Sequence, residues 1–169
     1  MSKDSTEQQS TDNGTAGVIA RPPLLFLAAL LLGFASDHLL RLPFPVARTG
    51  WVHWISAINA GVLILIGIAV FAASIRNFSR AATPVQGTRP TRALVTTGIH
   101  GWSRNPIYLG MFLVYLGIGL VVRSPSILLL AVPLAITIHY GVVVREEAYL
   151  ERRFGDAYRE YKVRVGRWL

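Results

Sequence analysis

The sequence predicts an all-α protein that spans a membrane with about four helices and ends in an amphipathic helix at the membrane surface. Hydrophobic residues make up 52% of the 169 residues and charged residues only 15%, and the mean hydropathy is +0.44. The apolar residues are gathered into runs that, at about 1.5 Å per residue in a helix, are long enough to cross a hydrocarbon core of about 30 Å. We expect a single domain at this length.

Four apolar runs carry the expected spans. They lie at about residues 22–40, 52–75, 106–122 and 125–144. Pro43 and Pro45 end the first run because proline cannot continue a helix, and Trp51 marks the membrane interface before the second. The last two runs are joined only by residues 123–125, so they form a hairpin, and Pro133 is expected to kink the fourth.

The polar segments set the ends of the domain and its orientation. Residues 1–20 are nearly free of large apolar side chains, so we expect a disordered tail followed by one membrane domain at 21–169. Of the 17 Lys and Arg residues, 14 fall in the tail, the polar 76–104 loop and the C-terminal region, which four spans place on one side. Because cytoplasmic segments carry the excess of basic residues, both termini are expected in the cytoplasm.

Charge and cysteine content exclude several classes of function. The net charge is +8, but basic residues beside long apolar runs are typical of cytoplasmic loops and contacts with anionic lipid, so nucleic acid is not an expected partner. The chain has no cysteine, which excludes disulfides, thiolate metal sites and a cysteine nucleophile. No metal site is expected.

One polar turn and one pair of acids are expected to form a common site. An arginine-bearing turn runs directly into an apolar helix between residues 98 and 110, and Glu146 and Glu147 follow the fourth span. The hairpin of the third and fourth spans returns these acids to the membrane face that carries Arg104 and Asn105.

The helical pattern directs both acids inward. Past Val144, apolar residues recur every three or four positions, and Glu146 and Glu147 precede Leu150 by four and three positions, so they share its apolar face. Adjacent inward carboxylates repel and need a cation, hydrogen-bond donors or a ligand. The alternative is an ordinary surface ion pair with Arg, which is worth less than about 1 kcal/mol.

Several short motifs occur in a fixed order in the C-terminal half. They are Leu94-Val95-Thr96-Thr97-Gly98, Ser103-Arg104-Asn105-Pro106-Ile107-Tyr108-Leu109-Gly110, Glu146-Glu147-x-x-Leu150, Phe154-Gly155-x-x-Tyr158-x-x-Tyr161 and Val165-x-Arg167-Trp168. Together they resemble the isoprenylcysteine carboxyl methyltransferase and phospholipid methyltransferase superfamily of integral membrane enzymes. The resemblance covers about residues 76–169 and extends, through Thr83-Pro84-Val85 and Arg89-Pro90-Thr91, to its small bacterial members.

The resemblance implies a methyltransferase of the bacterial inner membrane that uses S-adenosylmethionine. Its cofactor region would comprise residues 76–110 and 139–169, and its partners would be membrane lipid and a lipophilic or small methyl acceptor bearing a carboxylate, thiol or amine. The cofactor-binding residues that the resemblance implies are Val95, Thr96, Gly98, Ile99, His100, Arg104, Asn105, Pro106, Tyr108, Leu109, Glu146, Glu147 and Leu150.

Roles follow for the polar members of this set. Arg104 would hold the methionine carboxylate or an anionic substrate, and Glu146 and Glu147 would bind the cofactor's ammonium or ribose. His100 is the histidine of the loop and a candidate proton acceptor, with an exposed histidine of no role as the alternative. Arg104, His100 and Glu147 are therefore the candidate catalytic residues.

The sequence departs from the family pattern at two places. Ile99-His100-Gly101 stands where the family often has Pro-Tyr/Phe-Arg, and Asn105 stands where His often precedes the proline. An asparagine still offers an amide donor and acceptor. The missing arginine affects how an anionic substrate would be held.

Two other classes of function remain open. An NADPH-dependent membrane reductase of the sterol type is distantly similar in its C-terminal half, although the sequence lacks an additional basic cluster for a 2′-phosphate. A non-catalytic lipid-binding membrane protein is the third reading. Among methyl acceptors, isoprenylated cysteine, a phospholipid amine, a thiol and a small lipophilic acid all remain open.

Overall fold

The fold is a bundle of long helices. The computed structural model describes residues 17–40, 42–44, 49–84 and 91–169, and every regular element within these ranges is a helix. The elements are α1 (Pro22–Leu40), α2 (Trp51–Arg80), the 3₁₀ turn η1 (Gly98–Gly101), α3 (Pro106–Val121), α4 (Pro125–Ile138), the π-helical segment η2 (His139–Val143), α5 (Val144–Phe154) and α6 (Asp156–Arg164). The predicted all-α class is confirmed.

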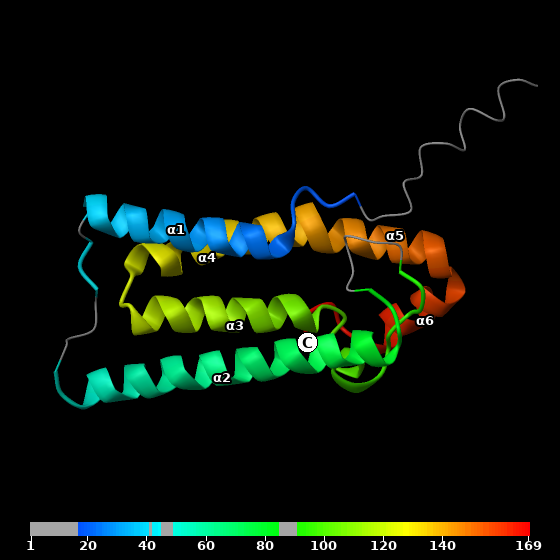
Figure 1. The fold of residues 1–169 in the computed structure, drawn as a ribbon, viewed down its shortest axis with the longest axis horizontal. Helices are drawn as coiled ribbons and strands as arrows, with labels where there is room; N and C mark the ends of the chain where they lie inside the picture. Colours follow the sequence, from blue (N-terminus) through cyan, green and yellow to red (C-terminus); the bar gives the residue numbers. More distant parts are fainter. Residues whose placement is uncertain (1–16, 41, 45–48, 85–90) are drawn as a thin grey trace, which may run out of the picture.

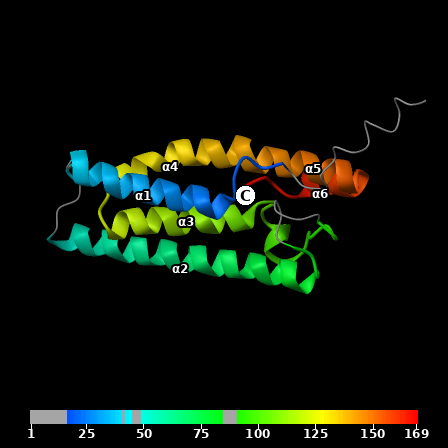
Figure 2. The same cartoon turned by 45° about the horizontal axis from the view of Figure 1, so that its top comes forward.

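The four long helices lie side by side, and successive helices run in opposite directions (Figures 1 and 2). One end of the bundle holds the starts of α1 and α3, the end of α2, and the helices α5 and α6 (Figure 1). The C-terminus also lies there. We call this end the site end.

Within the part of the chain that the structure describes, three helices are long and apolar enough to cross a membrane: α1, α2 and the continuous helix from Pro125 to Phe154. The first predicted span, 22–40, coincides with α1, whereas α2 continues past the predicted end at residue 75 to Arg80. α3 is shorter, with 16 residues. The count of four spans therefore stays a prediction.

Glycines let α2 and α3 approach closely. A Cβ added at Gly110 would lie 2.7 Å from the carbonyl oxygen of Gly67, and one added at Gly117 would lie 3.0 Å from the carbonyl oxygen of Ala60. Both contacts are with backbone, which cannot move aside as a flexible side chain can. Small residues at a helix–helix interface permit this close approach of two backbones.

At the opposite end of the bundle, α1 caps α4. Asp37 accepts a hydrogen bond from the backbone N–H of Ser126 at 3.2 Å, and the hydroxyl of Ser124 accepts one from the N–H of Ile127 at 2.9 Å. Both bonds satisfy amide groups that a helix start leaves without partners. Asp37 therefore has a structural contact near the membrane surface.

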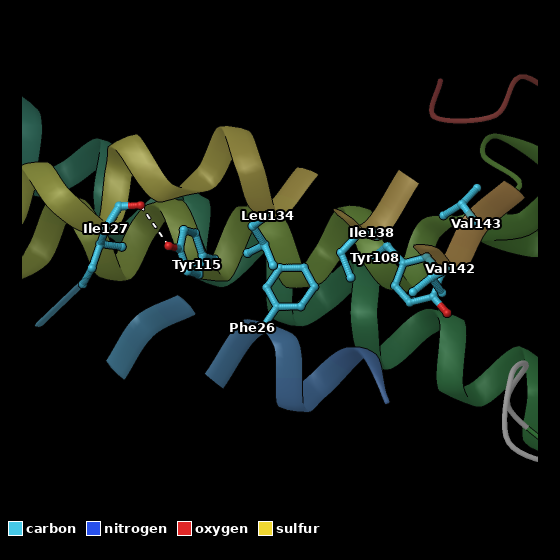
Figure 3. Packing of buried hydrophobic residues seen from close by; sticks show 8 residues of the cluster. All are labelled: Phe26, Tyr108, Tyr115, Ile127, Leu134, Ile138, Val142 and Val143. Atoms are coloured by element: carbon cyan, nitrogen blue, oxygen red, sulfur yellow. Dashed lines mark hydrogen bonds between the residues drawn. The ribbon is translucent and has the colours of Figure 1, made fainter. Parts of the chain in front are cut away.

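The main core runs the length of the bundle between α1, α3 and α4 (Figure 3). Its buried members are Phe26, Tyr108, Tyr115, Ile127, Leu134, Ile138, Val142 and Val143. The hydroxyl of Tyr115 donates to the carbonyl of Ile127 at 2.9 Å. This bond satisfies a polar group that would otherwise be buried alone.

The helix that carries the fourth predicted span continues past Val144. α4, η2 and α5 form one continuous helix, in which Pro133 is accommodated without a break and residues 139–143 take the π-helical form. The predicted single amphipathic helix is instead divided at Gly155, whose φ of 54° favours glycine. The paired acids thus stand on the same continuous helix as the fourth predicted span.

Part of the predicted tail contacts the bundle. Residues 1–16 lie outside the described residues, as does most of the Arg89-Pro90-Thr91 motif. The N–H of Ile19 donates to the carbonyl of Gly141 at 3.3 Å, and Val18 packs against the core. Val18 and Ile19, which the sequence assigned to the tail, therefore contact the bundle.

Candidate functional site

The polar turn before α3 is fixed by its proline. Proline is favoured at the first position of a helix, and the residue before it is biased away from helical conformation. Asn105 accordingly has φ −129° and ψ 48°, and α3 begins at Pro106. This geometry holds Asn105, which is 4% exposed, and the adjacent Arg104 at the site end of the bundle.

The two acids of α5 are both buried, as the helical pattern predicted. Glu146 is 1% exposed and Glu147 is 6% exposed. The Arg104 Nη1 atom lies 3.3 Å from Glu147 Oε1, and both side chains are more than nine-tenths buried. The structure therefore brings together the arginine and the acids that we expected to form one site, and excludes the surface-pair alternative.

Arg167 is the second cation at Glu147. Its Nε donates to Glu147 Oε1 at 3.1 Å and its Nη2 donates to Glu147 Oε2 at 2.8 Å. This two-pronged geometry is the strongest that an arginine and a carboxylate form. The hydrogen bonds to Glu147 raise the pKa of Arg167 above its ordinary value. We call Arg104, Glu146, Glu147 and Arg167 the polar cluster.

Glu146 has a different environment. Its Oε1 accepts a hydrogen bond from the Tyr108 hydroxyl at 2.9 Å. Its Oε2 is buried and has no hydrogen-bond partner among the described residues, and the same is true of Arg104 Nε and Nη1. The polar cluster therefore contains an open acceptor and open donors, which are costly to bury unless a ligand satisfies them.

The C-terminal segment covers the start of α3. The N–H of Arg104 donates to the carbonyl of Gly166 at 3.0 Å, and the side-chain amide of Asn105 donates to the carbonyl of Arg167 at 3.1 Å. The hydroxyl of Ser103 donates to the same carbonyl at 3.4 Å. The amide donor of Asn105 is thus used within the chain.

His100 lies against α2. It is 2% exposed, so the alternative of an exposed loop histidine is wrong. Its Nε2 is 3.4 Å from the Ser74 hydroxyl and its Nδ1 is 3.4 Å from the Asn77 amide nitrogen, while its edge packs on Phe78. Burial lowers the pKa of His100 to about 4. Its ring nitrogens face α2, and its role as a proton acceptor stays a prediction.

The segment before His100 lines a separate cavity of about 310 Å³. Val95, Thr96 and Gly98 of the predicted cofactor set contribute to its wall, beside Asn77 and Arg80 of α2. The Asn77 amide donates to the carbonyl of Thr97 at 2.7 Å. This bond ties the loop to α2 and fixes the conformation that leads into η1.

The remaining predicted residues are divided between core and backbone contacts. Leu150 packs in a second core cluster with Tyr149, Tyr158, Tyr161 and Val165. The carbonyl of Ile99 accepts from Trp102 and the N–H of Leu109 donates to Asn105. Two groups of the predicted set therefore emerge: the polar cluster with Asn105 and Tyr108, and the cavity wall.

Two residues of this region were missing from the predicted set. Arg167 stands in the last quoted motif, but it follows Val165, the last apolar position of the predicted helical pattern, by two residues, and nothing in the spacing indicates which way its side chain points. The hydroxyl of Tyr161 donates to the carbonyl of His100 at 2.6 Å, and burial raises the pKa of Tyr161 to about 12. The helical periodicity marked Tyr161 as buried but not its partner.

The fold and the cluster define an integral membrane protein with a largely buried Arg–Glu site at one end of a helical bundle. The chain belongs to the phospholipid methyltransferase family, whose model matches residues 55–157. This agrees with the resemblance to the isoprenylcysteine carboxyl and phospholipid methyltransferase superfamily, which is thereby confirmed.

Curated proteins that are similar to this chain are also named as methyltransferases. A protein-S-isoprenylcysteine O-methyltransferase of Rattus norvegicus is 32% identical over 166 residues, which is 87% of this chain and 56% of the relative. One from Tribolium castaneum is 30% identical over 68% of this chain and 41% of the relative. One from Saccharomyces cerevisiae is 37% identical over 43% of this chain and 30% of the relative. The chain thus spans about half or less of the length of these relatives, and no solved structure matches it.

Proposed function

We propose that the protein is an S-adenosylmethionine-dependent methyltransferase that modifies a lipophilic acceptor at the membrane. The observation that carries the proposal is the open, buried pair of groups in the polar cluster: Glu146 Oε2 without a donor and Arg104 Nε without an acceptor. An acceptor of negative charge beside a donor of positive charge is complementary to the ammonium and carboxylate of an amino acid, which is one end of this cofactor.

The described residues fit the cofactor in charge as well as in hydrogen bonding. The polar cluster holds two arginines and two glutamates, so a zwitterionic amino-acid group adds no net charge to the buried site. Glu146 would receive the ammonium and Arg104 the carboxylate. Glu147, already paired with both arginines, keeps the cations in place.

The protein itself has to supply little of the chemistry of methyl transfer. The cofactor supplies an activated methyl group. The chain's own residues bind and orient it, exclude water and align the acceptor. Tyr108 fixes one oxygen of Glu146 and thereby leaves the other directed to a ligand.

An apolar cavity supports a lipophilic acceptor. It has a volume of about 340 Å³ and lies between α1, α2 and α3, with Phe26, Phe71, Gly110, Met111 and Tyr115 in its wall. Gly110 lies two residues after Tyr108 on α3, so one end of the cavity is level with the first turns of α3, on a different face of the helix from Tyr108. The names of the relatives specify O-methylation of isoprenylcysteine, which favours a carboxylate on a lipid-bearing acceptor.

The proposal includes the membrane arrangement. Four spans, with α3 crossing beside α2, would put both termini and the polar cluster on the cytoplasmic side. The uneven distribution of basic residues supports this orientation.

Equilibrium binding to purified protein tests the function. We expect titration calorimetry to show binding of S-adenosylmethionine and of its demethylated product, and none of NADPH. Binding of NADPH instead would favour the sterol-type reductase, and binding of neither would favour a non-catalytic lipid-binding protein.

A control variant links the binding to the site. Glu160 is exposed on α6, so Glu160→Gln removes the same charge as Glu146→Gln without touching the polar cluster. Affinity that falls equally in both variants would contradict the proposed location.

A further inference from the structure

The C-terminal segment, residues 165–169, is built into the polar cluster. Its carbonyl groups accept hydrogen bonds from Arg104, Asn105 and Ser103. Trp168 packs against the main core, and a Cβ at Gly166 would collide with the carbonyl of Leu169. The segment is therefore held by backbone bonds and packing on both sides of Arg167.

The two arginines share Glu147 unequally. Arg167 engages both carboxylate oxygens, at 3.1 and 2.8 Å. Arg104 makes one contact with Glu147, at 3.3 Å through Nη1, and its side chain also hydrogen-bonds Tyr158. Its Nε and Nη1 have no hydrogen-bond partner among the described residues. The two-pronged position on the carboxylate can hold one guanidinium at a time.

We infer that Arg167 is a positioning residue of the cofactor site, which occupies both oxygens of Glu147 and so leaves Arg104 Nε, together with the weakly engaged Nη1, for the carboxylate of the ligand. This rests on the proposed function. Without Arg167, the carboxylate of Glu147 turns to Arg104, the two close a two-pronged pair, and the donors that the ligand needs are lost.

The test uses two ligands that differ in one group. Decarboxylated S-adenosylmethionine keeps the sulfonium and ammonium of the cofactor and lacks only the carboxylate. We expect Arg167→Gln to weaken binding of S-adenosylmethionine by about 10- to 100-fold, the value of a hydrogen bond to a charged group. The affinity for the decarboxylated ligand should change by less than about twofold, which a general loss of structure would not produce.

Matched variants keep the test specific. Arg164 is exposed in the last turn of α6, so Arg164→Gln removes the same charge three residues away and should leave both affinities unchanged. Arg167→Lys keeps the charge but not the fork and should give an intermediate loss; it carries the test if Arg167→Gln does not fold. In an Arg104→Gln background, Arg167→Gln should cost no further affinity, because its effect passes through Arg104.

Three results would overturn the inference. These are unchanged affinity in Arg167→Gln, an equal loss for both ligands, and a loss that persists in the Arg104→Gln background. A wild-type protein that does not bind S-adenosylmethionine would overturn the proposed function, and the inference with it. That failure is seen in the wild type, before any variant is compared.

Discussion

Glu147 and Glu146 are adjacent in the sequence but have opposite surroundings. Glu147 lies against two guanidinium groups, whereas Glu146 has one neutral donor, the Tyr108 hydroxyl. A buried charge is costly unless it is paired, and removing one member of a buried pair leaves the other uncompensated. The two residues should therefore respond differently to the same substitution.

Glu147→Gln should lower the free energy of unfolding by about 3 kcal/mol, because it leaves two arginines without their counterion. Glu146→Gln should change stability little, since the amide oxygen still accepts from Tyr108. It should instead weaken S-adenosylmethionine binding by about 1.5 to 3 kcal/mol. Thermal melts and titration calorimetry of both variants check this, with Glu160→Gln as control. Equal stability losses at 146 and 147 would contradict the assignment.

His100 makes stability depend on pH. Its pKa in the folded protein is about 4, against about 6.5 for an unfolded chain. The unfolded state therefore binds more protons between these values, and stability present above pH 6.5 is lost as the pH falls toward 4. At about 1.4 kcal/mol per pH unit, the loss reaches up to about 3 kcal/mol.

His100→Gln should flatten the fall in melting temperature between pH 6.5 and 4, because glutamine does not titrate there. His38 is exposed at the end of α1, and His38→Gln serves as control. An unchanged pH profile in His100→Gln would show that the acid sensitivity arises elsewhere.

Helices were predictable from the sequence where apolar runs set their length, and less so where the polar chain continues them. α1 matches the predicted 22–40 because helix and apolar run end together. α2 outlasts its apolar run by five residues, from Ile75 to Arg80, because polar residues continue a helix outside a membrane until the positive φ of Ala82 ends it. The π-helical turn at 139–143 has no signature in hydropathy.

At the scale of helix pairs, Gly110→Ala should destabilise the protein by about 1 to 3 kcal/mol, because the new methyl group meets backbone atoms of Gly67 and Phe71 within 3 Å. Gly61→Ala is the matched control. Nothing lies within 4 Å of a Cβ there, so it should be neutral or stabilising by up to about 1 kcal/mol. Equal effects in thermal melts would contradict the close α2–α3 contact.

The whole molecule has a polar end whose parts come from distant stretches of sequence. The short link between the third and fourth apolar runs predicted that Arg104 would lie close to Glu147. The chain path after Gly155 was not predictable, because a positive φ redirects it, and so the contact of Arg167 with Glu147 could not be derived from periodicity. A contact made by a non-helical segment with a residue far away in the sequence leaves no periodic pattern of residues from which it could be predicted.

Membrane orientation can be measured because the chain has no cysteine. We expect Val163→Cys, at a position that is 88% exposed, to react with a membrane-impermeant thiol reagent only from the cytoplasmic side. Thr49→Cys, in the exposed turn before α2, should react only from the opposite side. Labelling of both from one side would contradict the four-span arrangement and the cytoplasmic site.

The unbroken helix from Pro125 to Phe154 sets the depth at which Glu146 and Glu147 lie relative to the lipid. Glu146 follows Pro125 by 21 residues, which corresponds to about 32 Å of helix, just beyond a hydrocarbon layer of about 30 Å. The carboxylates then stand at the level of the lipid headgroups. Under the proposed function, a water-soluble methyl donor and a lipid-soluble acceptor would meet at this boundary, and neither would have to leave its own solvent.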